Sequence, residues 1–131
     1  MTAEQFRKFV LSFSESEESA HQHHPDFRVR GKIFATLGYP DDTWAMVKLT
    51  PEQQAEFVHD YPEVFRPANG AWGRQGSTIV CLPKARKARL QPAVEAAWLN
   101  AVAASIARKK KSARQRYDAL TSGPISKLDV I

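Results

Sequence analysis

The sequence predicts an α+β protein in which a twisted antiparallel sheet packs against helices as a two-layer sandwich. Three observations carry this prediction. Short runs rich in β-branched and aromatic residues, separated by turn residues, are typical of antiparallel strands. Two helix starts with the same polar signature lie before and after the first group of these runs. A stretch nearer the C-terminus repeats its apolar residues at intervals of three and four, which is the spacing of one helix face.

The first two helices begin at the same kind of polar start signal. Thr2 and Gln5 have the spacing of a capping box, and residues 3–12 follow with apolar side chains at helical intervals. The segment Thr50–Gln53 repeats this signal, with proline at the first helical position. The second helix is therefore expected to stop before Pro62, which cannot continue it.

The strands are expected between these helices and after the second one. Gly31 favours a tight turn with Arg30, because glycine adopts a positive φ angle at no steric cost. The acidic and polar residues 14–19 indicate a loop, and residues 19–24 indicate a short edge strand that ends at Pro25. The other strands are expected at residues 27–29, 32–37, 43–49, 64–66 and 77–82, with turns at residues 68–71 and 72–76.

The last helix is expected to open at Pro92 and to lose its apolar face after residue 107. Its core stripe consists of Leu90, Val94, Ala97, Trp98, Ala101, Val102 and Ile106. A basic run follows, and Gly123–Pro124 breaks any continuing helix, so a frayed extension and then a disordered end are expected. The sequence thus predicts one domain over residues 1–107 and a basic C-terminal tail, partly helical or disordered, over residues 108–131.

Length and composition limit the class of protein. A chain of 131 residues is long enough to bury one core. No run approaches the roughly 20 apolar residues of a membrane span, and the N-terminus lacks a secretory signal pattern, so no membrane partner is expected. The single cysteine, Cys81, excludes an internal disulfide and suits a reducing cytosol, so we expect a buried strand thiol and a cytoplasmic protein.

The net charge of +5 is concentrated near the C-terminus. Six cations without an acid among them lie in the basic run: Arg108, Lys109, Lys110, Lys111, Arg114 and Arg116. Without these six the chain has 13 basic residues against 14 acidic ones. The body of the domain is therefore nearly neutral, and the charge describes the tail more than the folded surface.

Several segments together resemble the MmcQ/YjbR family of small bacterial proteins, over roughly residues 3–107. The resemblance is carried by the segments His24–Ala35, Thr43–Gln53, Val64–Pro67 and Trp72–Thr78. It implies a fold similar to that of CyaY, the bacterial frataxin homologue. Members are often labelled DNA-binding, through hairpins placed against the duplex as a double wing. The resemblance supplies no catalytic residues, so we expect no enzymatic activity.

Basic residues of the expected sheet are the candidate nucleic-acid contacts. Arg28, Arg30 and Lys32 alternate through a hairpin, which can reach phosphates or enter a groove. Lys48, Arg66 and Arg74 are expected near the same sheet, with Trp72 as an exposed stacking residue in a turn and Arg108, Lys109, Lys110 and Lys111 as further phosphate contacts. The alternatives are a solvated sheet face whose cations deter edge pairing, and a tail that only solubilises the chain.

Other residues give weaker patterns. His21, His23 and His24 could ligate a transition metal, but further ligands at a recognisable spacing are missing, so an exposed polar loop is the other interpretation and no cofactor is expected. Asp41 and Asp42 follow a glycine and a proline, and turn formation accounts for them.

The sequence therefore predicts a small non-enzymatic DNA-binding protein that contacts the phosphate backbone through basic hairpins. The alternative is a module that binds a protein or a small ligand on the open sheet face. A metal-handling role for the three histidines ranks last. The sequence defines neither a DNA sequence preference nor an oligomeric state.

Overall fold

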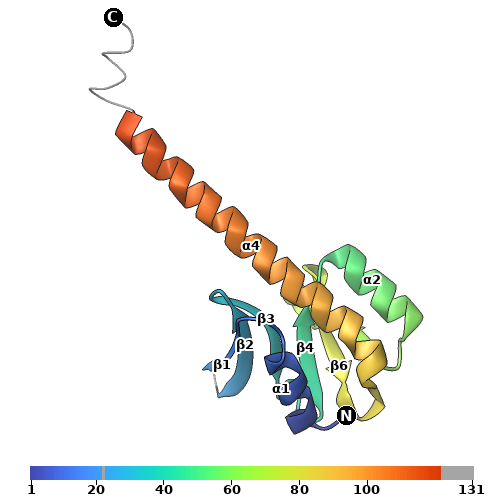
Figure 1. The fold of residues 1–131 in the computed structure, drawn as a ribbon. Coiled ribbons are helices and arrows are strands. Elements are labelled where there is room, and N and C mark those ends of the chain that lie inside the picture. The colour runs from blue at the N-terminus through green and yellow to red at the C-terminus, as the bar shows by residue number, and fades with distance from the viewer. Residues whose placement is uncertain (22, 122–131) are drawn as a thin grey trace, which may run out of the picture.

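The structure, a computed structural model, describes residues 1–21 and 23–121. Helices and strands follow each other in a mixed order along the chain (Figure 1). The elements are α1 (Ala3–Leu11), β1 (Ser16–His21), β2 (His24–Val29), β3 (Lys32–Leu37), β4 (Trp44–Lys48), α2 (Pro51–Asp60), β5 (Phe65–Pro67), α3 (Gly70–Arg74), β6 (Ser77–Cys81), the 3-10 turn η1 (Leu82–Lys84) and α4 (Lys87–Thr121).

The strands form one antiparallel sheet in the order β1-β2-β3-β4-β6-β5. Helices α1 and α4 cover one face of this sheet (Figure 1). Helix α2 is fastened beside α4, because the side-chain amide of Asn100 donates a 2.8 Å hydrogen bond to Gln53. The structure is thus an α+β sandwich with an open sheet, as the sequence predicted.

The core lies between the sheet and α4. Residues that pair across neighbouring strands point to the same face, and Phe27, Ala35, Val47 and Thr78 form such a row. All four are buried. From the helix side, the core receives Leu90, Val94, Ala97 and Ala101 of α4 together with Phe6 and Val10 of α1.

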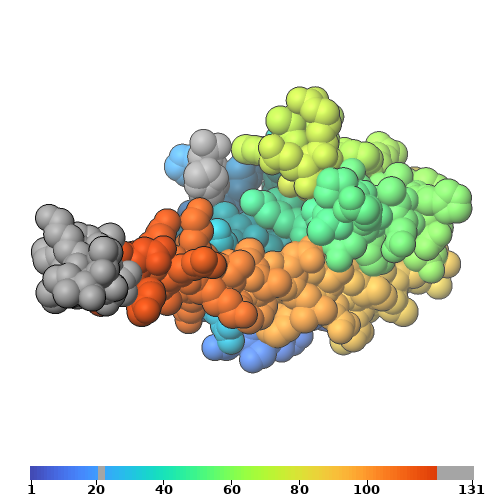
Figure 2. Space-filling model, turned by 90° about the horizontal axis from the view of Figure 1, so that it is seen from above, coloured from blue at the N-terminus to red at the C-terminus, as the bar shows by residue number. Residues whose placement is uncertain are grey.

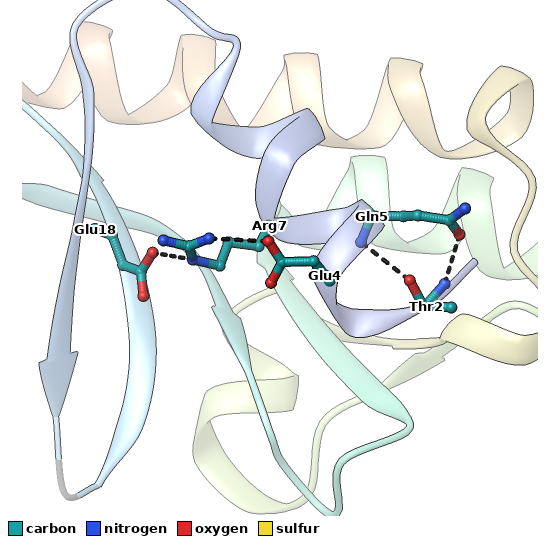
Figure 3. Close-up of polar contacts among 5 residues, drawn as sticks. All are labelled: Thr2, Glu4, Gln5, Arg7 and Glu18. Atoms are coloured by element: carbon teal, nitrogen blue, oxygen red, sulfur yellow. Dashed lines mark hydrogen bonds and ion pairs between the residues drawn. The ribbon is translucent and has the colours of Figure 1, made fainter.

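Several predicted elements are confirmed. Both capping boxes form, at Thr2 with Gln5 and at Thr50 with Gln53 (the first is drawn in Figure 3). Strand β3 spans residues 32–37 as predicted. The turn between β2 and β3 has positive φ at both Arg30 and Gly31, which suits a two-residue hairpin loop.

The loop prediction for residues 14–19 is wrong from Ser16 onward, because β1 begins there, and Pro25 lies inside β2 rather than ending a strand. Strand β1 is polar apart from Ala20, so it carries no alternating pattern, and backbone pairing with β2 defines it instead. Figure 3 shows a second attachment, in which Arg7 of α1 lies between Glu4 and Glu18 of β1. The hydrogen bond to Glu18 is the main reason that the pKa of Arg7 is raised.

The two turns predicted over residues 68–76 are also wrong in part, because the short helix α3 occupies residues 70–74. Glycine has a low helix propensity, so the sequence pattern does not predict this helix. The backbone at its glycines packs tightly against neighbouring backbone segments. A Cβ added at Gly73 would lie 1.7 Å from the carbonyl oxygen of Ala68, and one at Gly76 would lie 2.0 Å from that of Leu49. The backbone therefore requires glycine both within α3 and just after it.

Helix α4 begins at Lys87, five residues before Pro92, so the prediction that Pro92 opens it is wrong. Proline lacks the N–H that would bond the carbonyl of Ala88. Both residues are exposed, so water can reach that carbonyl. Beyond the core the helix continues to Thr121 and projects from the body (Figure 1). The predicted break at Gly123–Pro124 and the disordered end lie outside the described residues.

Candidate nucleic-acid interface

Antiparallel order brings several distant cations to one end of the sheet. At this end β2 leads into the turn with Arg30, β3 begins at Lys32 and β4 ends at Lys48. Strand β6 begins there as well, directly after α3 and Arg74. We call Arg30, Lys32, Lys48 and Arg74 the basic edge. Strands β3 and β6 lie two strand spacings apart, about 10 Å, so these side chains form a row rather than a cluster.

Acidic side chains reduce the charge of this edge at one point. The Arg30 guanidinium forms an ion pair of 3.2 Å with Glu15, which directly precedes β1. Both side chains are largely exposed, so the pair is weak and water screens it. Lys48 and Arg74 are exposed and Lys32 is half-buried. These three residues are the edge cations best suited to phosphate contact.

Arg28 has a different environment from its neighbour in the hairpin. Its guanidinium donates two hydrogen bonds, of 2.9 and 3.1 Å, to the two carboxylate oxygens of Asp26. Asp26 is only 1% exposed, and these bonds raise the pKa of Arg28. Arg28 therefore satisfies a buried carboxylate, and it would have to leave that carboxylate to bind a phosphate.

Arg66 lies on the same open face as Arg28 but far across the sheet. It is in β5, and its guanidinium carbon is 5.4 Å from the centre of the Trp44 ring. Strands β2 and β5 are four strand spacings apart, about 19 Å. The predicted hairpin contacts and Arg66 are therefore not part of one compact site.

Trp72 is the exposed aromatic residue that the sequence predicted, with 72% of its surface accessible. It belongs to α3. In Figure 2 the yellow-green part of the chain that contains α3 projects on the side of the molecule away from α4. The side-chain amide of Gln54 donates 3.0 Å hydrogen bonds to the carbonyls of Gly73 and Ser77. Trp72 and Arg74 are thus presented by a well-fastened element rather than by the loose turn that was predicted.

The six cations of the basic run lie on α4, and all of them are exposed. We call residues 108–116 the basic helix segment. Its first residue lies beside the hairpin turn, because a Cβ added at Gly31 would be 3.9 Å from a guanidinium nitrogen of Arg108. An open depression of about 560 Å³ lies along the surface of this segment, and its lining residues are Arg108, Lys109, Ser112, Ala113 and Arg116. The basic edge and the basic helix segment are therefore neighbours.

The sequence analysis missed two features of this region. The contact between Gly31 and Arg108 joins residues far apart in the chain, and no local sequence pattern predicts it. The burial of Asp26 was also missed, although an acid two residues before an arginine on a strand places both on one face. Among the described residues, no three His, Cys, Asp or Glu side chains are grouped so that they could hold a metal ion. The side chain of His21 is outside the described part.

Comparison with known proteins identifies the domain. The YjbR family model matches residues 11–100. The chain belongs to the YjbR family. The crystal structure of Deinococcus radiodurans protein DR2400, a DUF419 domain, is similar with a TM-score of 0.62 at 17% identity, covering 75% of this chain and 76% of that one. At that identity the similarity shows the fold alone. No curated protein matches the chain significantly.

The family match separates the two basic regions of this YjbR protein. The basic edge lies within residues 11–100, and the basic helix segment lies beyond them. Within residues 1–21 and 23–121, no helix is both long and apolar enough to cross a membrane. The family match therefore gives no information about the role of the basic helix segment.

Proposed function

We propose that this YjbR protein is a non-enzymatic, cytoplasmic DNA-binding protein that contacts the phosphate backbone through the basic edge and the basic helix segment. The observation that carries this proposal is the position of Arg108 beside the turn at Gly31. It brings the start of the basic helix segment next to the hairpin turn, where the basic edge begins. Because the body is nearly neutral, position rather than net charge favours binding at this end of the sheet.

Each part of this region would contribute in a different way. The six cations of the basic helix segment attract any polyanion and give affinity that falls steeply with salt. The basic edge holds two of its cations on strand ends, one in the hairpin turn and one on α3, which fixes their spacing and so would orient the duplex. Trp72, next to the edge, is available for stacking or for insertion between bases. Neither part supplies a base-specific contact.

Binding of a labelled duplex across a salt series tests the proposal, with variants matched in charge. Replacing Lys32, Lys48 and Arg74 by glutamine removes three cations from the basic edge. The control replaces Lys84, Arg86 and Lys87, which follow β6 at the opposite end of the sheet. If all three edge cations contact phosphates, the edge variant should lower the salt slope by about 2.7, at roughly 0.9 per phosphate, and the control should lower it little.

Two results would contradict the proposal in different ways. Equal losses in the edge variant and the control would mean that net charge, not position, explains binding. A chain ending at Ala107 provides the second result, because it keeps every residue that is buried against the sheet. If binding at physiological salt disappears with this truncation, the tail alone accounts for it and the basic edge is not a nucleic-acid surface.

A second function is supported by the open face of the sheet. Met46, Ile79 and Trp44 are half-buried there, and Arg66 lies over the Trp44 ring. A partly apolar face with an aromatic ring and a cation suits a protein or small ligand with a planar, anionic group. Side-chain NMR signals of Met46 and Trp44 in a titration with small aromatic acids test this function. Unchanged signals throughout would contradict it.

A further inference from the structure

Helix α4 carries a regular line of apolar residues on the side turned away from the sheet. Pro92, Leu99, Ile106, Ala113 and Leu120 follow one another at intervals of seven, and all are exposed. We call them the outer stripe. The large members are substantially accessible, with Leu99 at 51%, Ile106 at 41% and Leu120 at 69%. Figure 2 shows α4 running along the surface of the molecule.

The spacing of the outer stripe is that of a helix–helix contact. Residues seven apart drift slowly around an α-helix, so they form a line that a second helix can follow, and we call this line of contact the seam. A coiled coil repeats two apolar positions in every seven residues, and the outer stripe supplies one of them. The position three residues further on holds Glu95, Val102, Lys109 and Arg116, so the contact is a single line of apolar side chains. The buried residues of α4 belong to another set: Leu90, Ala93, Val94, Ala97, Ala101 and Ser105. The helix therefore has one face that builds the domain and a second, regularly spaced face outside it.

We propose that the outer stripe pairs with the outer stripe of a second copy of this chain, in antiparallel orientation about Ile106. In this register Ile106 faces its own counterpart, Leu99 faces Ala113, and Leu120 faces Pro92. The stripe is symmetric about its centre, so every member meets an apolar residue of the other copy. A two-fold axis requires this self-complementarity.

The charges of α4 favour the antiparallel orientation over the parallel one. In the antiparallel register the basic helix segment faces residues 96–104, which contain no charged residue. The centres of the two basic segments are then about 18 Å apart along the helix axis, from a rise of 1.5 Å per residue. This exceeds the screening length of about 8–10 Å. Parallel pairing would instead place the two segments side by side, where like charges repel.

The rim of the seam gives one further match. Glu95 lies directly opposite Tyr117 of the other copy, so the antiparallel register also brings it near the neighbouring Arg116. An exposed ion pair of this kind adds little affinity, but it disfavours other registers. The two sheets would lie on opposite outer sides of the helix pair. The basic edge of each copy is at a strand end and would stay accessible.

Sedimentation velocity of the full chain over a range of concentrations tests self-association. Ile106→Glu puts two like charges at the centre of the seam and should raise the dimer dissociation constant by roughly 100-fold, at a cost of several kcal/mol for such contacts. The matched control is Ala107→Glu, which adds the same charge at an exposed position beside the stripe. The control should sediment like the native chain. A native chain that stays monomeric, or equal weakening in both variants, would overturn the proposal.

Cross-linking tests the orientation separately, in chains where Cys81 is replaced by serine. With a short bis-maleimide, Ile106→Cys should link to itself, because the two side chains meet on the two-fold axis. Ala113→Cys should not link to itself, since its counterpart is about 21 Å away, but should link to Leu99→Cys in a mixture. Self-linking at all three positions would mean parallel pairing and would overturn the antiparallel register. Binding of the monomer to anionic vesicles through Ile106, without dimers, would overturn the proposal entirely.

Discussion

Replacing Gly73 by alanine should disturb α3 much more than its small change in volume suggests. The added Cβ would lie 1.7 Å from the carbonyl oxygen of Ala68, whereas ordinary contacts lie beyond 3.4 Å. The backbone must therefore move by well over an ångström. Overpacking of this kind costs about 1–3 kcal/mol, and loss of the hydrogen bond from Gln54 adds about 1 kcal/mol. We expect a loss of about 2–4 kcal/mol in the free energy of unfolding.

Urea unfolding, followed by tryptophan fluorescence, measures this loss. Gly70→Ala is the matched control in the same helix, because a Cβ there meets nothing within 4 Å. Gly70 has a φ of +69°, so its replacement should cost about 1–2 kcal/mol from backbone strain alone. A Gly73→Ala variant no less stable than the Gly70→Ala variant would refute the reasoning. It would mean that α3 moves freely and does not hold Trp72 in a fixed position.

Two further predictions concern charged residues. Arg28→Gln should lower the melting temperature more than Arg66→Gln, because Arg28 is bonded to the buried carboxylate of Asp26 and Arg66 only covers a ring; thermal unfolding followed by circular dichroism measures both, and equal effects would contradict the ordering. For Asp41, hydrogen bonds from the hydroxyl and the backbone N–H of Thr43 hold the pKa below its ordinary value of 3.8. This folded-state pKa lies below the unfolded one, so the stabilisation is present above the unfolded pKa and lost as the pH falls through the folded pKa. Asp41→Asn should therefore be less stable than the native chain at neutral pH and should match it in strong acid; a gap that persists in acid would contradict this cause.

The parts of the fold that the sequence predicted are those set by local chemistry. A capping box needs only two residues three apart, so Thr50 and Gln53 suffice to place the start of α2. Strand β3 has a sharp turn before it and a glycine after it, which fixes both of its ends. In each case the information lies within a few residues of the element that it defines.

The elements that were missed depend on distant partners. Strand β1 is polar apart from Ala20, and its pairing with β2 makes it a strand. Helix α3 is held by Gln54 of α2, whose side-chain amide donates hydrogen bonds to the carbonyls of Gly73 and Ser77. No pattern within either segment records these contacts, so the sequence predicted a loop for the first part of β1 and turns for α3.

The candidate site was predictable in its residues but not in its arrangement. The alternation of Arg28, Arg30 and Lys32 indicated one basic hairpin, yet the structure ties Arg28 to a buried carboxylate and leaves Lys32 at the strand end. Lys48 and Arg74 join Lys32 only because β4 and β6 follow β3 in the sheet. Strand order is a tertiary property, and no local pattern in the sequence records it.

The two proposals together make a prediction about stoichiometry. Each basic helix segment lies beside the hairpin turn of its own chain, so one copy would hold a complete phosphate-binding region. Antiparallel pairing places two such regions toward opposite ends of the seam rather than next to each other. A dimer should then bind two short duplexes independently, and Ile106→Glu should lower the affinity for a short duplex no more than Ala107→Glu, which adds the same charge beside Arg108 without disturbing the seam. If Ile106→Glu abolished both dimer formation and short-duplex binding, the two copies would instead build one shared DNA-binding surface.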